Sequence, residues 1–211
     1  MATQIPEDTY KPETQAHDSE TKILIVTGND VEDLEFFYPY YRFIEAGFAV
    51  DVATIDGGAF KGKHGEPMKE SLKVADINPL EYSLLYLPGG KAPAKLKEDE
   101  DVMALVRQYY NGGKTICAIC HGPQILAAAD IIEGRRIAAW PEVEQEVADA
   151  GGIYTNEETV VDERFITGRW PADLPALTGK VMEVLGADTT GIPSGMQADD
   201  VQRPAANDLL S

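Results

Sequence analysis

Residues 118–126, AICHGPQIL, place a cysteine and a histidine side by side. A thiol and an imidazole are the groups that cysteine-based nucleophilic catalysis requires, because the imidazole can take the proton of the thiol. Cys120 is therefore the candidate nucleophile and His121 its candidate partner. Neighbouring side chains usually diverge, so His121 could instead move protons on a substrate. The simpler alternative is a structural thiol beside a surface histidine.

The flanking residues predict where this pair lies. The β-branched apolar run at 114–119 is typical of a buried strand, and Gly122-Pro123 is typical of the first turn of a helix. A nucleophile between a strand and a helix stands on a sharp turn at the carboxyl edge of the sheet. We expect the helix N-terminus to lower the pKa of the Cys120 thiol, and the backbone N–H of His121 to stabilise an oxyanion.

Cys117 and Cys120 also form a C-x-x-C pattern, which can indicate a redox or a metal site. Strand geometry disfavours both interpretations, because residues three apart on a strand face opposite sides of the sheet. A zinc site would need two further ligands, and the chain has only three histidines. We therefore expect a buried Cys117, no metal ion and no cofactor.

Two other loops converge on the same edge. Glu32 and Glu35 stand at the start of an expected helix, where their spacing places them on one face. An ionised carboxylate beside the sulfur would raise the pKa of the thiol, whereas a protonated one can donate a hydrogen bond to it. A glutamate that serves Cys120 must therefore be kept protonated by burial. Helix capping is the alternative, and it fits Glu32 better than Glu35. The Gly89-Gly90 turn offers a second oxyanion donor.

Three residues are candidates for the rim of the pocket, namely Glu32, His64 and Arg169. His64 lies in a glycine-rich stretch, where an exposed loop histidine is the simpler interpretation. Arg169 precedes the last expected helix and would lie near the active-site rim, with Asp173 as the cap of that helix.

The elements that must position these residues alternate along the chain. Buried strands without polar alternation, interleaved with helices, predict an α/β fold with a mostly parallel sheet covered on both faces. Pro39 should kink the first helix or shift its start. The stretch 56–71 is either an excursion or a hairpin. The expected strands are 22–27, 48–55, 83–90, 114–119 and 135–140, with an extended pair at 159–167, and the expected helices are 31–46, 99–111, 122–132, 143–150 and 172–185.

Composition limits the partners and the compartment. The chain is 44% hydrophobic and 26% charged, which is typical of a globular protein, and no apolar stretch reaches the ~20 residues that span a bilayer. Its N-terminus lacks the pattern of a secretory signal, so we expect a cytoplasmic location. The net charge of −18 disfavours nucleic acid and anionic membranes as partners. Acidic tails at 1–20 and 187–211 carry −4 and −3 of this charge and leave −11 on a domain at 21–186.

The chain resembles the ThiJ/PfpI superfamily, in particular its intracellular-protease-like (PfpI) branch. The resemblance rests on VEDLEFFYPYYRFIEAG, GKHG, LPGGKAP, GKTICAICHGPQILAAA and RWPADLPAL, in the family's order over about residues 22–185. It implies a flavodoxin-like α/β/α sandwich, similar to class I glutamine amidotransferase domains, that assembles as a dimer or a hexamer.

The resemblance also implies roles for individual residues. Cys120 would be the nucleophile, His121 its partner, and Glu35 the glutamate hydrogen-bonded to the thiol, with the N–H groups of Gly90 and His121 as oxyanion donors. One departure concerns the branch's Cys-His-Glu triad, whose glutamate comes from a neighbouring subunit. Ala94 takes that place here, so nothing obvious orients the imidazole.

Three functions follow from these residues. The first is cofactor-free chemistry on 2-oxoaldehydes or their adducts, of the glyoxalase III or deglycase type, in a stress response. The second is a cysteine peptidase, which would need another carboxylate in place of the missing one, such as Glu98 or an acid from another subunit. The third is a redox-sensing or chaperone-like role without catalysis. Either enzyme would act on a small carbonyl compound or a peptide, and Ala94 weakens the peptidase more.

Overall fold

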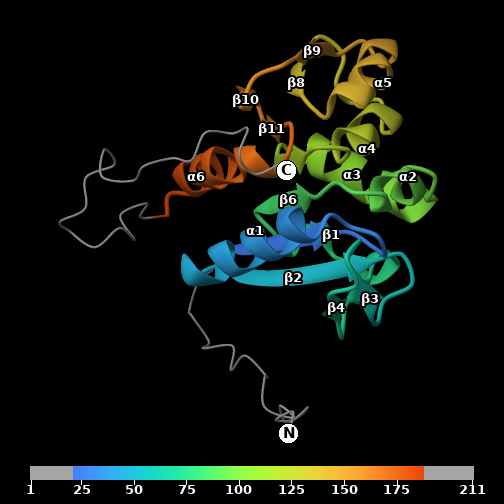
Figure 1. The fold of residues 1–211 in the computed structure, drawn as a ribbon, viewed down its shortest axis with the longest axis vertical. Helices are drawn as coiled ribbons and strands as arrows, with labels where there is room; N and C mark the ends of the chain where they lie inside the picture. The colour runs from blue at the N-terminus through green and yellow to red at the C-terminus, as the bar shows by residue number, and fades with distance from the viewer. Residues whose placement is uncertain (1–20, 188–211) are drawn as a thin grey trace, which may run out of the picture.

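A computed structural model describes residues 21–187 of the chain, so the acidic tails expected at 1–20 and 187–211 lie almost entirely outside the described residues. A seven-stranded sheet forms the centre of the domain (Figure 1). The strand order is β10-β11-β7-β6-β1-β2-β5, and all neighbours are parallel except β10, which runs antiparallel to β11. The strands of this sheet are β1 (Lys22–Val26), β2 (Ala49–Thr54), β5 (Leu72–Lys73), β6 (Leu84–Leu87), β7 (Thr115–Ile119), β10 (Thr159–Asp162) and β11 (Phe165–Gly168).

Helices cover both faces of the sheet, as a parallel sheet requires (Figure 1). On one face α1 packs against α6, and on the other α3 packs against β7 and α4. The α-helices are α1 (Asp33–Glu45), α2 (Ala92–Leu96), α3 (Glu100–Asn111), α4 (Pro123–Ala128), α5 (Glu144–Asp149) and α6 (Leu174–Val184). Short 3-10 turns are η1 (Val74–Asp76), η2 (Pro79–Glu81), η3 (Pro141–Val143) and η4 (Pro171–Asp173).

Burial explains why the central strands lack polar alternation. All four residues of β6 are buried, and so are the last four residues of both β1 and β7. These strands contact a helical layer on each side, so neither face can carry polar side chains. The expected flavodoxin-like α/β sandwich with a mostly parallel sheet is confirmed.

Two short sheets lie outside the central one. The stretch that sequence left open between excursion and hairpin contains β3 (Phe60–Lys61) antiparallel to β4 (Pro67–Met68), so it is a hairpin. The strand expected at 135–140 is β8 (Arg136–Ala138), which pairs with β9 (Ile153–Thr155) rather than with the central sheet. The extended pair expected at 159–167 is the β10–β11 hairpin.

Several element boundaries differ from the predictions. Helix α4 ends at Ala128 instead of reaching residue 132, because Asp130 adopts a left-handed backbone with φ of 57°. Pro39 lies inside α1, which continues past it to Glu45. Helix α2, which the sequence pattern did not indicate, follows the Gly89-Gly90 turn.

None of the helices in residues 21–187 combines the length and the apolar character needed to cross a membrane.

Candidate active site

Cys120 stands on a strained turn between β7 and α4. Its backbone φ is 60°, a conformation that costs energy for any residue with a side chain. The turn is held by two backbone hydrogen bonds: Cys120 N–H donates to Gly168 O at 3.1 Å, and Trp140 N–H donates to Cys120 O at 2.9 Å. Gly122 must lack a side chain, because a Cβ there would lie 2.2 Å from the carbonyl oxygen of Leu87. This is the geometry expected of a nucleophile elbow.

The thiol and the imidazole meet in spite of being neighbours in sequence. Cys120 Sγ lies 3.2 Å from Nδ1 of His121, within hydrogen-bond distance. The imidazole stacks on the indole of Trp140, with ring centroids 5.9 Å apart and an interplanar angle of 26°. Burial lowers the pKa of His121 below its usual 6.5, so the imidazole is neutral at pH 7 and can accept a proton.

Glu35 is fully buried beside the sulfur. Its Oε2 accepts a hydrogen bond of 2.9 Å from the N–H of Gly89, and its carboxyl interacts with the Cys120 thiol. A Cβ at Gly89 would lie 2.5 Å from Glu35 Oε2 and 2.7 Å from Cys120 Cβ, so glycine is what lets the three groups approach. Burial raises the pKa of Glu35 to about 8, which keeps this carboxyl protonated at neutral pH.

The thiol itself is a weaker acid than sequence predicted. Burial raises the pKa of Cys120 above its usual 9.0, and a charged Glu35 raises it further. Hydrogen bonds from the backbone N–H groups of Gly90 and His121 act in the opposite direction. The expectation of a lowered pKa is therefore wrong, because burial of the sulfur and the charge of Glu35 outweigh these two hydrogen bonds.

The same two N–H groups are the ones that we expected from the sequence to stabilise an oxyanion. Gly90 and His121 both direct their backbone N–H at the sulfur, so an oxygen on a carbon bound to that sulfur would lie within their reach. Gly90 has φ of 78°, and a Cβ there would lie 2.3 Å from the backbone nitrogen of Glu32.

Glu32 is buried and does not cap α1. It occupies the N-cap position without a side-chain hydrogen bond to the helix, so the capping interpretation is wrong. Its Oε2 forms an ion pair of 2.7 Å with Nζ of Lys63, whose ammonium also interacts with the charges of Cys120 and Glu35. Glu32 therefore holds the Lys63 ammonium where the charges of Glu32, Cys120 and Glu35 raise its pKa.

His64 is exposed, as the simpler interpretation expected, and its Nδ1 lies 2.9 Å from Oδ2 of Asp33. Oxygens of Glu32 and Asp33 and a nitrogen of His64 lie within 4.8 Å of one another. Lys63 already neutralises Glu32 in this group. Asp33 Oδ1 is buried and has no hydrogen-bond partner within residues 21–187.

Arg169 is half-buried and fixed from two sides. Its Nε and one terminal nitrogen lie 2.9 and 3.0 Å from the two carboxylate oxygens of Asp173, and the other terminal nitrogen lies 2.9 Å from Oδ1 of Asn156. The guanidinium packs over the indole of Trp170 at 4.2 Å. Asp173 makes no capping hydrogen bond to α6, so the expected cap is wrong and its carboxylate serves Arg169 instead.

No hydrogen bond joins the His121 imidazole to a carboxylate within residues 21–187, in keeping with Ala94 in the place of a triad glutamate. Glu142 and Glu146 are the carboxylates whose charges raise the pKa of His121, rather than Glu98. Lys97 and Gln124 bind Glu146 at 2.7 Å each.

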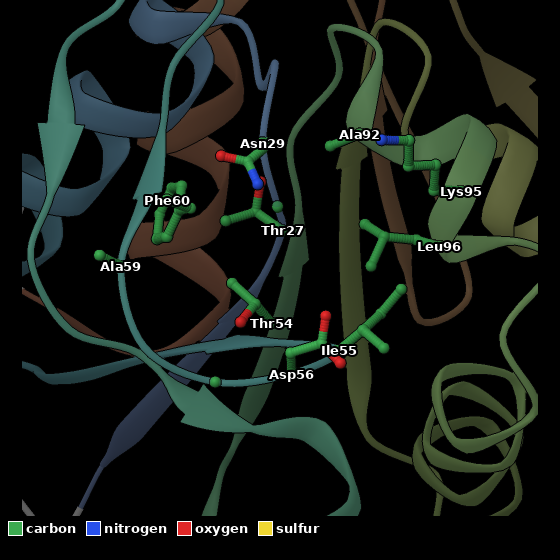
Figure 2. A pocket seen from close by; sticks show the side chains of 12 residues that line it. Thr27, Asn29, Thr54, Ile55, Asp56, Ala59, Phe60, Ala92, Lys95 and Leu96 are labelled. Carbon is green, nitrogen blue, oxygen red and sulfur yellow. The ribbon is translucent and has the colours of Figure 1, made fainter.

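A pocket of about 220 Å³ opens near this site, at the carboxyl ends of β1 and β2 (Figure 2). Thr27, Thr54, Phe60 and Lys95 are among the residues around it. None of the candidate catalytic residues lines this pocket.

Sequence reasoning missed Trp140, Lys63 and Tyr86, which support the site from other elements. Trp140 is the last residue of the expected strand at 135–140, and nothing in the local sequence pattern links it to His121. Tyr86 is a buried residue of β6 whose hydroxyl donates to the carbonyl oxygen of Glu35 at 2.8 Å. Lys63 lies in the GKHG motif, but nothing in that motif indicates its ion pair with Glu32.

Comparisons with known proteins agree with this geometry. The model of the DJ-1/PfpI family matches residues 21–184. Deglycase PH1704 of Pyrococcus horikoshii is 37% identical over 164 residues, which cover 78% of this chain and 99% of that protein. Protein/nucleic acid deglycase 2 of Escherichia coli is 39% identical over 171 residues, covering 79% of this chain and 98% of that protein.

A solved structure shares the fold. It is a two-domain protein of Anabaena variabilis with DJ-1/ThiJ/PfpI-like and ferritin-like domains, and it superposes with a TM-score of 0.79 at 28% identity over 87% of this chain and 52% of that one. The match of the family model over nearly the whole described domain, together with the cysteine on its elbow, identifies the chain as a member of the DJ-1/PfpI family.

Proposed function

We propose that this protein is a cysteine-dependent enzyme that needs no cofactor and acts on 2-oxoaldehydes or their adducts, of the glyoxalase III or deglycase type. The observation that carries the proposal is the contact of the Cys120 thiol with a neutral imidazole on one side and a protonated carboxyl on the other. The deglycase names of two relatives that match over almost their whole length support it.

The first step forms a covalent adduct. His121 takes the proton of the Cys120 thiol, and the sulfur adds to the aldehyde carbon of a 2-oxoaldehyde. The electron pair of the C=O bond moves to oxygen, where the N–H groups of Gly90 and His121 stabilise it. The imidazolium then protonates this oxygen, which leaves a hemithioacetal and a neutral His121.

The second step moves a hydrogen within the adduct. His121 removes the proton from the carbon that carries the sulfur, and the electron pair moves to the adjacent ketone oxygen. The hydroxyl proton of the sulfur-bearing carbon passes to that oxygen, and the imidazolium then protonates the former ketone carbon. The sulfur-bearing carbon thus becomes the carbonyl of a 2-hydroxy acid thioester. Water cleaves the thioester and restores the thiol. Methylglyoxal plus water thus gives lactate, with no external oxidant or reductant. Glu35, kept neutral by burial, donates a hydrogen bond to the sulfur and avoids a second negative charge beside the thiolate.

The test measures lactate formed from methylglyoxal without glutathione. Cys120→Ser should reduce the rate to background, whereas Cys117→Ala should retain it, because Cys117 is fully buried within β7. A glycated amine, assayed in parallel, distinguishes the deglycase from the glyoxalase reaction. Equal background rates for the unmodified protein and Cys120→Ser on both substrates would contradict the proposal.

A cysteine peptidase remains the second candidate, because the contact between Cys120 Sγ and His121 Nδ1 would serve acylation as well. It has less support, since Ala94 leaves the imidazole without a bound carboxylate. A fluorogenic peptide in the same assay decides between the two. A redox sensor requires a thiolate that oxidises readily, and the raised pKa of Cys120 counts against it. The cytoplasmic location and the homo-oligomer stay predictions.

A further inference from the structure

The pocket at the carboxyl ends of β1 and β2 has no role in the proposed reaction, because none of the residues used there lines it. Its lining residues lie within 27–29, which follow β1, within 54–60, which begin at the end of β2, and within 92–96, which form α2 (Figure 2). Open α/β sheets bind ligands in the crevice outside the carboxyl ends of their strands. We call this feature the β1–β2 pocket.

The size and the walls of the β1–β2 pocket limit its occupant. Its volume is about 220 Å³, and an apolar cavity of about 150 Å³ can hold benzene. By that measure the pocket holds a molecule of about nine non-hydrogen atoms. Part of the wall is apolar, formed by Ile55 and by the buried side chains of Phe60 and Leu96. The occupant is therefore a small molecule with an aliphatic part.

Two opposite charges line the same pocket. Lys95 on α2 and Asp56 in the loop after β2 are both exposed, and neither forms an ion pair with another residue of 21–187. Figure 2 shows them at separate positions around the pocket. A ligand with one charge would pair with one of them and leave the other unpaired. A zwitterion can pair with both, and because it is neutral overall, a chain of net charge −18 does not repel it.

Thr27 provides an independent observation. Its side chain lines the pocket and is 1% exposed, and its Oγ1 has no hydrogen-bond partner within residues 21–187. Thr54 also lines the pocket, but its Oγ1 lies 2.9 Å from Oγ of Ser71. A buried hydroxyl without a partner costs free energy, so an unpaired one beside a pocket points to a ligand that pairs with it.

From these observations we propose that the β1–β2 pocket binds a free aliphatic α-amino acid of about the size of leucine. The carboxylate of the amino acid pairs with Lys95 and accepts a hydrogen bond from the hydroxyl of Thr27. Its ammonium pairs with Asp56, and its side chain packs against Phe60 and Leu96. The site lies outside the catalytic residues, so it does not depend on the proposed function.

The binding test titrates the full chain with L-leucine and follows the backbone amide signals of Gly28 and Gly57, which line the pocket. Both signals should shift, whereas the signal of Gly134, outside the pocket, should not. Two analogues each lack one charge: 4-methylpentanoate has no ammonium and 3-methylbutylamine has no carboxylate. Each should bind at least about twofold more weakly than leucine. No shift with leucine, or equal binding of either analogue, would overturn the proposal.

Charge variants test the two ion pairs. Lys95→Met and Asp56→Asn should each raise the dissociation constant of leucine about 2- to 5-fold, the range for exposed ion pairs. Lys69→Met removes the same charge from an exposed lysine that does not line the pocket, so it is the matched control and should leave binding unchanged. Cys120→Ser should also bind leucine normally, which separates this site from the proposed reaction. Equal effects of Lys95→Met and Lys69→Met would overturn the proposal.

Thr27→Val tests the buried hydroxyl. Valine has nearly the same shape, and it removes an unpaired buried group, so the midpoint of urea unfolding without leucine should not fall. Leucine should nevertheless bind about tenfold more weakly, because its carboxylate loses a hydrogen bond. An unchanged affinity for leucine in this variant would overturn the proposal.

Discussion

The side chains of Glu35 and Cys120 have very different pKa values in water, and burial raises both pKa values. The carboxyl, with an ordinary pKa of 4.5, is shifted to about 8, and the thiol is shifted above 9.0. Two negative charges cannot be kept side by side at low cost in a buried site, so the pair holds at least one proton at neutral pH. In the proposed reaction, the thiolate of Cys120 therefore forms by proton transfer to His121 rather than being present beforehand.

This assignment predicts a bell-shaped pH profile of kcat/KM for methylglyoxal. Activity should fall on the acid side below pH 6.5, because the lowered pKa of His121 leaves it protonated only there. It should fall on the alkaline side around pH 8, where Glu35 ionises and its charge opposes the thiolate. Glu35→Gln should lose the alkaline limb, because an amide does not titrate.

The same variant should be only modestly slower at pH 7, by about tenfold or less, because the amide still donates to the sulfur. Rates measured from pH 5 to 10 on both proteins test this. An alkaline limb with the same midpoint in Glu35→Gln would show that another group titrates there.

At the scale of elements, Pro39 explains why a side chain of β6 forms a hydrogen bond with the backbone of α1 at the site. A helical N–H normally bonds to the carbonyl four residues earlier, and a proline at position 39 leaves the carbonyl of Glu35 without that donor. The hydroxyl of Tyr86 on β6 supplies the hydrogen bond instead, at 2.8 Å. The residue that carries the buried carboxyl is therefore fixed to the sheet through its own backbone.

A double-mutant cycle tests this substitution of donors. Tyr86→Phe should destabilise the protein by about 1–3 kcal/mol, because it leaves a buried carbonyl without a partner. In a Pro39→Ala background the new backbone N–H can bond to the Glu35 carbonyl, so Tyr86→Phe should cost about 1 kcal/mol less. Urea unfolding of the four proteins gives the coupling energy. An equal cost of Tyr86→Phe in both backgrounds would refute the compensation.

At the scale of the whole molecule, the missing triad carboxylate and the charge of the chain bear on assembly. In the resembling branch the triad glutamate belongs to a neighbouring subunit, and Ala94 occupies its place on an exposed position of α2. The net charge of −18 makes subunits repel each other at low ionic strength. Any association must therefore overcome a repulsion that salt screens.

Light scattering coupled to size exclusion should find particles of two or six times the chain mass. Raising the salt concentration should shift the distribution toward the larger species, because screening removes the repulsion between acidic subunits. A single chain mass at every salt concentration would rule out the homo-oligomer.

The order of buried strands, helices and turns along the chain could be predicted from the sequence. The run at 114–119 can be recognised from sequence alone, because burial on both faces leaves only apolar residues from Ile116 to Ile119. Cys120 could be placed on its elbow because this apolar run precedes it and Gly122-Pro123, typical of a helix start, follow one residue after it. Short elements such as α2 were missed, and the end of α4 was misplaced, because a helix of five or six residues shows little periodicity.

The chemistry of the site was decided by tertiary structure. Sequence could state that a glutamate serving the thiol must be protonated and buried, but only the fold placed Glu35 beside Gly89 and Cys120, and its burial there raised its pKa. Only the fold brought Trp140 onto His121. The sequence by itself thus determined the family and the fold and nominated Cys120 as the nucleophile, because all three depend on local patterns. Tertiary structure decided the protonation of Glu35 and the ring contact of His121, because burial and ring contacts arise between residues far apart in the chain.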